Sequence, residues 1–207
     1  MKPPPQTNLQ PDFSEEAFLL KNGFGCVAGL DEVGRGCLAG PVVAAAVILN
    51  PQCLPIGIND SKKLSHAKRK EWDKIIKKEA IDFSIGFASN EEIDEINILE
   101  ASKLAMIRAL HKLKVKADYL LLDGNFGLPV GIPFKPVIKG DSKVLSIAAA
   151  SVVAKVFRDE WMEALDCEFP GYELARNKGY GSVPHRLALQ SKGLSPLHRK
   201  TFQWRVL

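Results

Sequence analysis

The stretch Gly29-Leu30-Asp31-Glu32-Val33-Gly34-Arg35-Gly36 decides how the rest of the chain is interpreted. It continues an apolar run that begins at Cys26 and precedes a second apolar run over residues 42–49. It therefore predicts the end of one strand, a glycine-rich turn and then another strand, an arrangement that suits an antiparallel pair. Both strands are too apolar for sheet edges, and the first one ends in two adjacent carboxylates.

Asp31 and Glu32 need an explanation, because consecutive strand residues point to opposite faces. They converge only where the strand ends or where a divalent cation holds both. The alternative is that both are solvated residues at a strand end and that the glycines merely form the turn. The glycines also approximate a dinucleotide-binding fingerprint, which must open a helix. Because Pro41-Val42-Val43 begins a β-branched run instead, we reject that interpretation.

The whole chain has an ordinary globular composition, with 207 residues of which 46% are hydrophobic. We expect the proline-rich residues 1–12 to form a flexible N-terminal arm and residues 13–207 to form a single domain. The formal net charge of +4 permits a nucleic-acid partner without demanding one.

The cysteines and the N-terminus bear on the compartment. None of the four cysteines has a spacing typical of zinc sites or redox motifs, which favours free thiols in a reducing environment. The N-terminus lacks the apolar region of a secretory signal, and no run approaches transmembrane length. We expect a cytoplasmic monomer without a membrane partner.

Two further aspartates follow apolar runs in the same way. Residues 117–122 read as a buried strand that ends in Asp123, and a third strand delivers Asp141 just before an alanine-rich helix over residues 142–165. The alternatives are an ordinary Asp-Gly turn for Asp123 and a helix N-cap for Asp141. Small residues in that helix allow it to approach the sheet closely, which would carry Asp141 toward the other acids.

Cations and one tyrosine complete the candidate set. Lys62 and Lys63 precede a lysine-rich helix and are candidates for nucleic-acid backbone contacts, the alternative being an ordinary solvated face. Tyr180 stands between two glycines, which weaken any element that would bury it, so we interpret its ring as presented to a ligand. The four scattered histidines read as surface or packing residues, although His185 lies near Tyr180 in sequence.

The remaining elements follow from periodicity and capping signals. We predict a short helix capped by Ser14, a half-buried strand over residues 81–87, a long helix opened by capping signals at Ser89 and Asn97, and a last helix from about residue 184 to Gly193. Asp94 and Glu95 belong to the helix-start chemistry and are left out of the site.

Four carboxylates at the ends of separate elements, with no cysteine or histidine cluster, describe an all-oxygen site suited to Mg²⁺ or Mn²⁺. Without cations such a cluster would repel itself. Two hard cations can activate water and stabilise the leaving oxygen in a displacement at phosphate. The acids therefore predict a two-metal site that acts on a phosphodiester, and the nearby cations and glycine loops indicate a nucleic acid.

A series of motifs follows in order along the chain. They are Asp31-Glu32-Val33-Gly34-Arg35-Gly36 with Leu38-Ala39-Gly40-Pro41-Val42, Asp60-Ser61-Lys62-Lys63-Leu64, Asp123-Gly124-Asn125, Lys139-Gly140-Asp141 followed by Ser146-Ile147-Ala148-Ala149-Ala150-Ser151, and Lys178-Gly179-Tyr180-Gly181. On these motifs the chain resembles ribonuclease HII over about residues 27–202, and a series of this length makes the resemblance specific. Three departures, Cys37, Ser182 and Leu194, touch no proposed ligand.

The resemblance implies an α/β, ribonuclease H-like fold, with a mixed central β-sheet flanked by α-helices and a small helical C-terminal part. It implies an endonuclease that cuts the RNA strand of RNA–DNA hybrids and incises 5′ of ribonucleotides embedded in duplex DNA, leaving a 3′-hydroxyl and a 5′-phosphate. The implied metal ligands are Asp31, Glu32, Asp123 and Asp141. The implied substrate contacts are Gly34, Arg35, Gly36 and Tyr180 at the ribonucleotide, and Lys62 and Lys63 at phosphates.

Two other classes of function compete with this interpretation. One is a different metal-dependent nuclease or strand-transfer enzyme on a similar fold, which the choice of substrate would distinguish. The other is a non-catalytic duplex-binding module, which is disfavoured because such a module has no reason to keep four carboxylates that repel one another.

Overall fold

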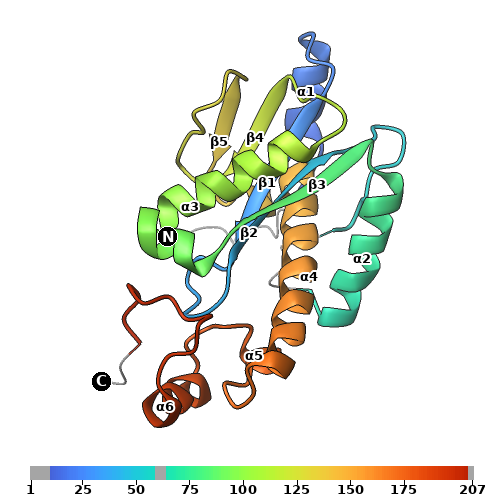
Figure 1. Cartoon of the computed structure of the whole chain (residues 1–207). Helices are drawn as coiled ribbons and strands as arrows, with labels where there is room; N and C mark the ends of the chain where they lie inside the picture. Colours follow the sequence, from blue (N-terminus) through green and yellow to red (C-terminus); the bar gives the residue numbers. More distant parts are fainter. Residues whose placement is uncertain (1–9, 59–63, 205–207) are drawn as a thin grey trace, which may run out of the picture.

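The computed structural model describes residues 10–58 and 64–204 (Figure 1). The predictions for Lys62, Lys63 and residues 1–9 of the N-terminal arm lie outside the described residues. Asp12 is described, and it forms a parallel bridge with Val144, which ties the start of the described chain to the segment before the longest helix.

A five-stranded mixed sheet in the order β3-β2-β1-β4-β5 forms the centre of the fold. The strands are β1 (Val27–Val33), β2 (Val42–Ile48), β3 (Asp82–Ala88), β4 (Tyr119–Asp123) and β5 (Phe134–Val137). β1 pairs antiparallel with β2 and parallel with β4, β2 pairs antiparallel with β3, and β4 pairs parallel with β5. The predicted mixed sheet, with an antiparallel first pair away from its edges, is confirmed.

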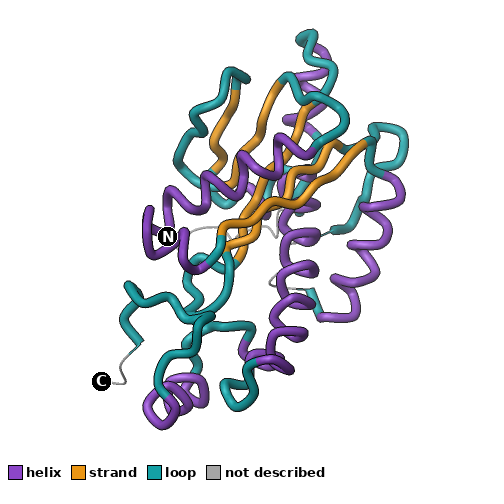
Figure 2. The backbone as a smooth tube through the Cα atoms, viewed as in Figure 1, coloured by secondary structure: helices purple, strands orange, loops and turns teal. Residues whose placement is uncertain are grey.

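Helices cover both faces of this sheet (Figure 1). α3 (Asn90–Lys112) lies on one face, and α4 (Leu145–Glu168) and α2 (His66–Glu79) lie on the other. α1 (Ser14–Lys21) precedes β1, and a short 3₁₀ helix, η1 (Gly140–Ser142), precedes α4. The short α5 (Leu174–Asn177) and α6 (Val183–Lys192) gather with long loops beyond one end of the sheet, as Figures 1 and 2 show.

The two helical layers bury two separate apolar cores, because alternate strand residues face opposite sides. In β2, Ala44 and Ala46 belong to the core under α3 with Met106, whereas Val43 and Ala45 belong to the core under α4. Every residue of β2 is buried. A strand buried on both faces reads as a continuous apolar run, which is the pattern seen in the sequence.

Gly29 lets α4 approach β1 closely. A Cβ atom placed on Gly29 would lie 2.3 Å from the Ser146 carbonyl carbon and 2.5 Å from the Ile147 nitrogen, so a side chain cannot be accommodated without moving the helix. Asp31, two residues further along β1, points to the same face as Gly29. The close approach therefore sets the position of α4 beside this carboxylate.

The long helix α3 begins as predicted, with a capping box in which the Ser89 and Glu92 side chains each bond the backbone of the other. The second predicted capping signal, at Asn97, marks a kink in the helix, where Asn97 has a φ of 68°. Its Oδ1 accepts from the amides of Leu99 at 2.9 Å and Glu100 at 3.2 Å. The predicted helix end is also confirmed, since Gly193 follows the last residue of α6.

Two local predictions are wrong, and one short helix was not predicted. Ser14 does not cap α1; it is the first helical residue, and its amide donates to Asp12 Oδ1 at 2.8 Å. Asp141 is neither the end of a strand nor a helix N-cap, because β5 ends at Val137, η1 intervenes and the N-cap of α4 is Val144. The short helix α5 was not anticipated, since a single turn carries too little periodicity to be recognised.

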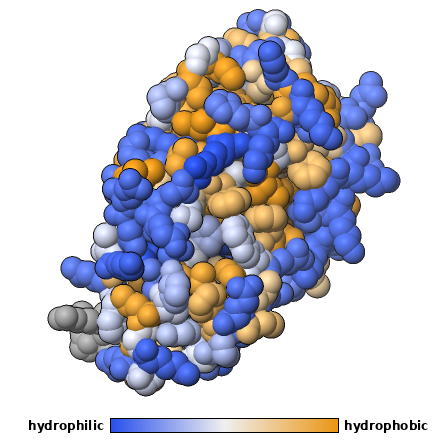
Figure 3. All heavy atoms as spheres, viewed as in Figure 1, coloured by the Kyte–Doolittle hydropathy of each residue, from blue (hydrophilic) through white to orange (hydrophobic). Residues whose placement is uncertain are grey.

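Hydrophilic residues cover most of the face seen in Figure 3, and hydrophobic residues appear between them in several separate patches. In the described parts of the chain, no helix is both long and apolar enough to span a bilayer.

Candidate active site

The sheet topology brings the four predicted acids to one place. β1 and β4 run parallel with Leu30 opposite Leu122, so Asp31 and Asp123 lie one residue further, at the same end of adjacent strands. Asp123 Oδ1 accepts a hydrogen bond from the Gly140 amide at 2.7 Å, which holds η1, and with it Asp141, against the end of β4.

The cluster is buried and electrostatically crowded. Asp31 is only 5% exposed. Its pKa is raised well above the usual value, first by burial and then by the negative charges of Glu32, Asp123 and Asp141, while a hydrogen bond with Ser151 opposes the rise. Charges that act on one another in this way must lie close together, so the four acids form one cluster in the structure.

Glu32 bridges the acids and the neighbouring turn. Burial raises its pKa, and the hydrogen bond and the positive charge of Arg35 oppose that rise. Its Oε1 accepts from Arg35 Nη1 at 2.9 Å, whereas its buried Oε2 has no hydrogen-bond partner. An unpartnered buried carboxylate oxygen is costly unless something positive or protic binds it.

The donor set fits a hard divalent cation, because it consists of carboxylate oxygens that need positive charge. In the conformation described, however, the carboxylate side chains of the cluster do not surround a position for an ion. Asp31 Oδ1 accepts from the Glu32 amide at 2.7 Å. Among the residues the structure describes, no group of three or more His, Cys, Asp or Glu side chains is arranged to hold a metal as it stands.

The Gly34-Arg35-Gly36 turn is held from behind by a buried arginine. Arg199 is 1% exposed and donates to the carbonyls of Gly34 at 2.7 Å, Arg35 at 2.8 Å and Gly40 at 2.9 Å. Gly34 has a φ of 95°, and a Cβ there would lie 2.3 Å from Arg158 Nε, so only glycine fits. At Gly36 a Cβ would meet nothing within 4 Å, which leaves this side of the turn open to a ligand.

The Tyr180 loop lies directly beside that turn. Tyr180 forms an antiparallel bridge with Cys37, and the Leu38 amide donates to the Gly179 carbonyl at 2.7 Å. The Tyr180 ring is 40% exposed, with Lys155 Nζ 5.7 Å from its centroid. The pKa of the Tyr180 hydroxyl is raised to about 12, mainly by burial, so this group stays protonated at neutral pH. The prediction of a presented ring is consistent with this geometry.

Arg158 is a second buried arginine that the sequence interpretation missed. Its guanidinium donates to the carbonyls of Pro41 at 2.9 Å, Ala39 at 3.1 Å and Lys178 at 2.8 Å, and thereby joins the segment after the turn to the Tyr180 loop. The signal in the sequence was a charged residue inside an alanine-rich apolar helix. It was passed over because arginine is usually exposed, and a single arginine in a helix is expected on its solvent-facing side.

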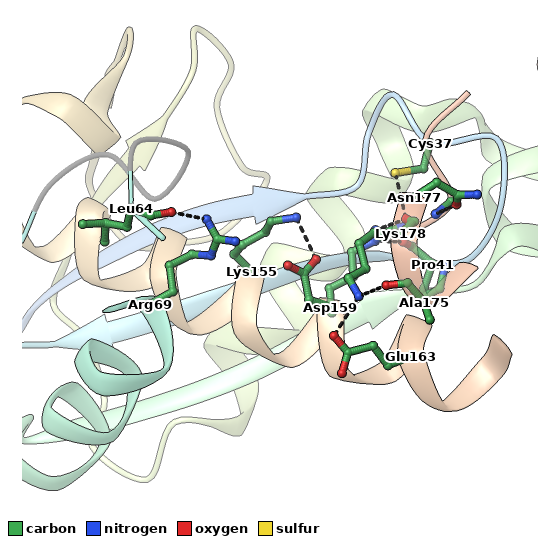
Figure 4. Close-up of polar contacts among 12 residues, drawn as sticks. Cys37, Pro41, Leu64, Arg69, Lys155, Asp159, Glu163, Ala175, Asn177 and Lys178 are labelled. Atoms are coloured by element: carbon green, nitrogen blue, oxygen red, sulfur yellow. Dashed lines mark hydrogen bonds and ion pairs between the residues drawn. The ribbon is translucent and has the colours of Figure 1, made fainter. Parts of the chain in front are cut away.

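Figure 4 shows α4 presenting alternating charges along one side, with the Lys178 side chain meeting it from the loop after α5. Lys155 Nζ lies 2.7 Å from Asp159 Oδ1, and Lys178 Nζ lies 2.7 Å from Glu163 Oε1. These ion pairs fix two cations close to Tyr180. The sequence analysis included Lys178 in a motif without giving it a role, and it did not select Lys155.

Comparison with known proteins agrees with this geometry. A family model described as Ribonuclease HII matches residues 28–205. The chain belongs to the ribonuclease HII family. A Ribonuclease HII from Syntrophotalea carbinolica is 49% identical over 96% of the chain and 95% of its own length, and one from Ruegeria pomeroyi is 52% identical over 94% of the chain and 83% of its own length.

A solved structure of similar fold is the PCNA:RNase HII complex from Archaeoglobus fulgidus. It has a TM-score of 0.75 and 27% identity, and the match covers 88% of this chain and 98% of that one. The ribonuclease H-like fold predicted from the sequence is thereby confirmed. As a ribonuclease HII, this protein is a metal-dependent endonuclease, a hydrolase that acts on RNA–DNA hybrids. The alternative of a non-catalytic binding module is wrong.

Proposed function

We propose that this ribonuclease HII, besides cutting the RNA strand of hybrids, incises duplex DNA 5′ of a single embedded ribonucleotide and leaves a 3′-hydroxyl and a 5′-phosphate. The observation that carries the proposal is the position of the acids immediately beside two glycine-containing segments that meet in one surface. The acids supply hydrolysis, and the joined Gly34-Arg35-Gly36 turn and Tyr180 loop supply a surface that distinguishes one sugar from its neighbours.

Asp31, Glu32, Asp123 and Asp141 would hold two divalent ions, Mg²⁺ or Mn²⁺. When bound, such ions supply an activated water and neutralise the charge that develops on the leaving oxygen. The support for this assignment is the all-oxygen donor set, the raised pKa of Asp31 and Glu32, and the unpartnered Glu32 Oε2. Arg35 holds Glu32 in place through its 2.9 Å contact before an ion enters.

Recognition of the ribonucleotide is the task of the neighbouring backbone. The 2′-hydroxyl distinguishes RNA from DNA, and a protein reads it with polar groups placed within hydrogen-bond distance. The open side of Gly36 allows a sugar to approach the backbone of the turn, while Arg199 keeps the turn rigid. The half-exposed Tyr180 ring offers an apolar face to the adjoining deoxyribose, where an additional hydroxyl would fit poorly.

Cations near the ring would meet the phosphate backbone. Lys155 and Lys178 lie beside the Tyr180 loop and supply positive charge without reading sequence, whereas the buried Arg158 holds the loop through backbone carbonyls. Lys62 and Lys63 remain proposed phosphate contacts on the basis of the sequence. A cytoplasmic location is favoured by four free thiols. The monomeric state stays a prediction, which light scattering after gel filtration would check.

The test compares three labelled duplexes: one all-DNA, one with a single ribonucleotide and one long RNA–DNA hybrid. Each is incubated with Mg²⁺, Mn²⁺ or a chelator. We expect a single nick at the ribonucleotide and multiple cuts in the hybrid with either ion, and no cutting of all-DNA duplex or with chelator. Cutting of the hybrid without incision at the single ribonucleotide would refute the proposed substrate range.

A further inference from the structure

Two buried histidines connect the C-terminal segment to the Tyr180 loop. His185 lies on α6 and His198 lies in the segment that follows it, and their side chains are buried, with exposures of 0% and 1%. His185 Nε2 and His198 Nε2 are 3.0 Å apart. At the far ends of the pair, His185 Nδ1 lies 2.9 Å from the Tyr180 carbonyl oxygen, and the Ser195 amide donates to His198 Nδ1 at 3.0 Å.

Only one set of tautomers satisfies all these contacts. The Ser195 amide can only donate, so His198 Nδ1 carries a lone pair and the single proton of the neutral ring is on Nε2. That proton is donated to His185 Nε2, which must then be the acceptor. The proton of His185 is therefore on Nδ1 and is donated to the Tyr180 carbonyl. The hydrogen bonds run in one direction from Ser195 to Tyr180.

The segment that starts this chain of bonds is itself fixed to the turn. His198 forms an antiparallel bridge with Ala39, the Arg199 amide donates to the Leu38 carbonyl at 2.9 Å, and the Gly40 amide donates to the Leu197 carbonyl at 2.9 Å. The histidine pair thus crosses from a segment anchored beside Gly34-Arg35-Gly36 to the carbonyl of the proposed recognition tyrosine.

We infer that His185 and His198 form a neutral hydrogen-bonded relay that positions Tyr180 against the turn. The inference deepens the proposed function, since it depends on Tyr180 reading the ribonucleotide. His185 and His198 are positioning residues; their side chains are buried and do not reach a substrate.

The surroundings keep both rings neutral. The groups that face the pair are the Tyr172 ring, 4.8 Å from the His198 centroid and 6.4 Å from that of His185, the Tyr180 carbonyl, Ser195, and the cation Arg186. Burial lowers the pKa of both histidines, that of His198 to about 4, and the neighbouring His185 adds to the effect on His198. A second proton would place two N–H groups against each other at 3.0 Å.

The variants are chosen to separate positioning from general stability. His198→Leu removes the donor to His185, whereas His198→Gln keeps an N–H donor at nearly the same reach. Tyr172→Phe is the matched control, because it removes one partly buried hydrogen bond in the same cluster, to the Gly193 carbonyl at 3.1 Å, and leaves the hydrogen bonds of the relay in place. Each is assayed on the single-ribonucleotide duplex and on the long hybrid.

For His198→Leu we expect the ratio of single-ribonucleotide to hybrid cutting to fall about ten-fold. For His198→Gln and Tyr172→Phe it should stay within about three-fold of wild type. Melting temperatures are recorded in parallel, since a merely structural role lowers both rates together and leaves the ratio unchanged. Where Tyr180→Ala lowers the ratio, an unchanged ratio in folded His198→Leu overturns the inference.

Two measurements test the relay apart from the proposed function. Nitrogen-15 NMR of the imidazoles at pH 7 should show His198 protonated at Nε2 and His185 at Nδ1; any other protonation pattern overturns the assignment. Tyr180→Ala is assayed alongside. If it leaves the substrate ratio unchanged, the proposed role of Tyr180 fails, and a crystal structure of His198→Leu then decides the relay: a displaced Tyr180 supports it and an unmoved Tyr180 overturns it.

Discussion

At the scale of single residues, Asp31 shows how a reactive group opposes the stability of its fold. Burial and three neighbouring carboxylates raise its pKa, so the folded chain binds this proton more tightly than the unfolded chain does. A raised carboxyl pKa contributes stability that is complete below about pH 3.8 and lost as the pH rises through the folded value. Above the folded pKa the ionised cluster therefore destabilises the folded state.

Asp31→Asn removes this repulsion, so we expect it to raise the melting temperature at pH 7.5 in chelator by about 3 °C, the shift that ~1 kcal/mol gives a domain of this size. The same change should abolish cleavage. Adding Mg²⁺ should then raise the melting temperature of wild type but not of the variant, because only wild type gains from binding.

Asp118→Asn is the matched control for that experiment. It makes the same change just before β4, where the Asp118 carboxylate accepts from the Gly25 amide at 2.6 Å and the Cys26 amide at 3.0 Å. An asparagine side chain has only one acceptor oxygen, so it can accept from only one of these two amides. The control should therefore lower the melting temperature. A destabilised Asp31→Asn would show that the cluster is held by bonds that outweigh its repulsion.

Tyr180 is expected to act through its ring. Tyr180→Ala should reduce incision at a single ribonucleotide about ten-fold more than cutting within a hybrid, since we propose that the ring packs against the sugar beyond the ribonucleotide. Tyr180→Phe should retain both rates, because the hydroxyl, with its pKa near 12, is protonated throughout the working range. Rates on both substrates at fixed metal and salt check this; an equal fall on both would assign Tyr180 to general binding.

Some site residues could be recognised from the sequence and others could not, and the difference lies in what surrounds them along the chain. Asp31 and Asp123 were recognisable because an ionisable residue directly after a buried apolar run is unusual. Arg158 and Arg199 bond only backbone carbonyls, and the partners of Arg199 lie 159 to 165 positions away in sequence. Every residue type has a backbone carbonyl, so the identity of the partner residue does not indicate such a contact, and a sequence pattern cannot reveal it.

At the scale of elements, the contact between β1 and α4 positions the acids. The sequence predicted the helix and its small residues, and the structure confirms their close packing on the sheet. The error at Asp141 arose at an element boundary, where a 3₁₀ turn replaces the expected helix start. Side-chain periodicity cannot distinguish one turn of 3₁₀ helix from the first turn of an α-helix.

Gly29→Ala tests this contact. Its methyl group would overlap the Ser146 backbone at 2.3 Å, so α4 must shift or β1 must bend, at a cost of about 3 kcal/mol. Because Asp31 and η1 depend on this interface, cleavage should fall even at temperatures where the variant is folded. Urea unfolding and hybrid cleavage measure the two effects.

Gly131→Ala serves as the control for Gly29→Ala, since a Cβ at Gly131 meets nothing within 4 Å. It should leave both stability and cleavage close to wild type. If Gly29→Ala behaved like this control, the backbone would relax more easily than the packing of β1 on α4 indicates.

At the scale of the whole molecule, three distant segments build one surface beyond the end of the sheet. Residues 34–40, the loop that carries Tyr180, and residues 195–199 are joined by bridges, buried arginines and the histidine pair. The small helical C-terminal part predicted from the sequence thus does more than close the fold. It supplies the framework against which the turn and the Tyr180 loop are held (Figure 1).

This framework should make global stability depend on pH. The folded state lowers the pKa of His198 to about 4, whereas the unfolded chain retains a value near 6.5. Between these values the unfolded chain binds a proton that the folded chain does not, so the free energy of unfolding falls as the pH falls. The contribution is complete above about pH 6.5 and is lost toward pH 4.

Asp31 and Glu32 act with the opposite sign over part of the same range, because their protonation relieves repulsion in the folded state. Wild type alone therefore cannot isolate the histidine effect. His198→Gln has no titrating group at this position but keeps the acid cluster. The contribution of the cluster to the free energy of unfolding therefore cancels when the two proteins are compared at each pH.

We predict that the stability advantage of wild type over His198→Gln shrinks by on the order of 1 kcal/mol between pH 7 and pH 5 in chelator, a value reduced for solvent screening. Urea unfolding at the two pH values measures it, with Tyr172→Phe as a variant of the same cluster that removes no histidine and should keep a constant difference from wild type. A constant difference for His198→Gln as well would mean that His198 takes up its proton equally in both states, and that the buried pair tolerates a charge.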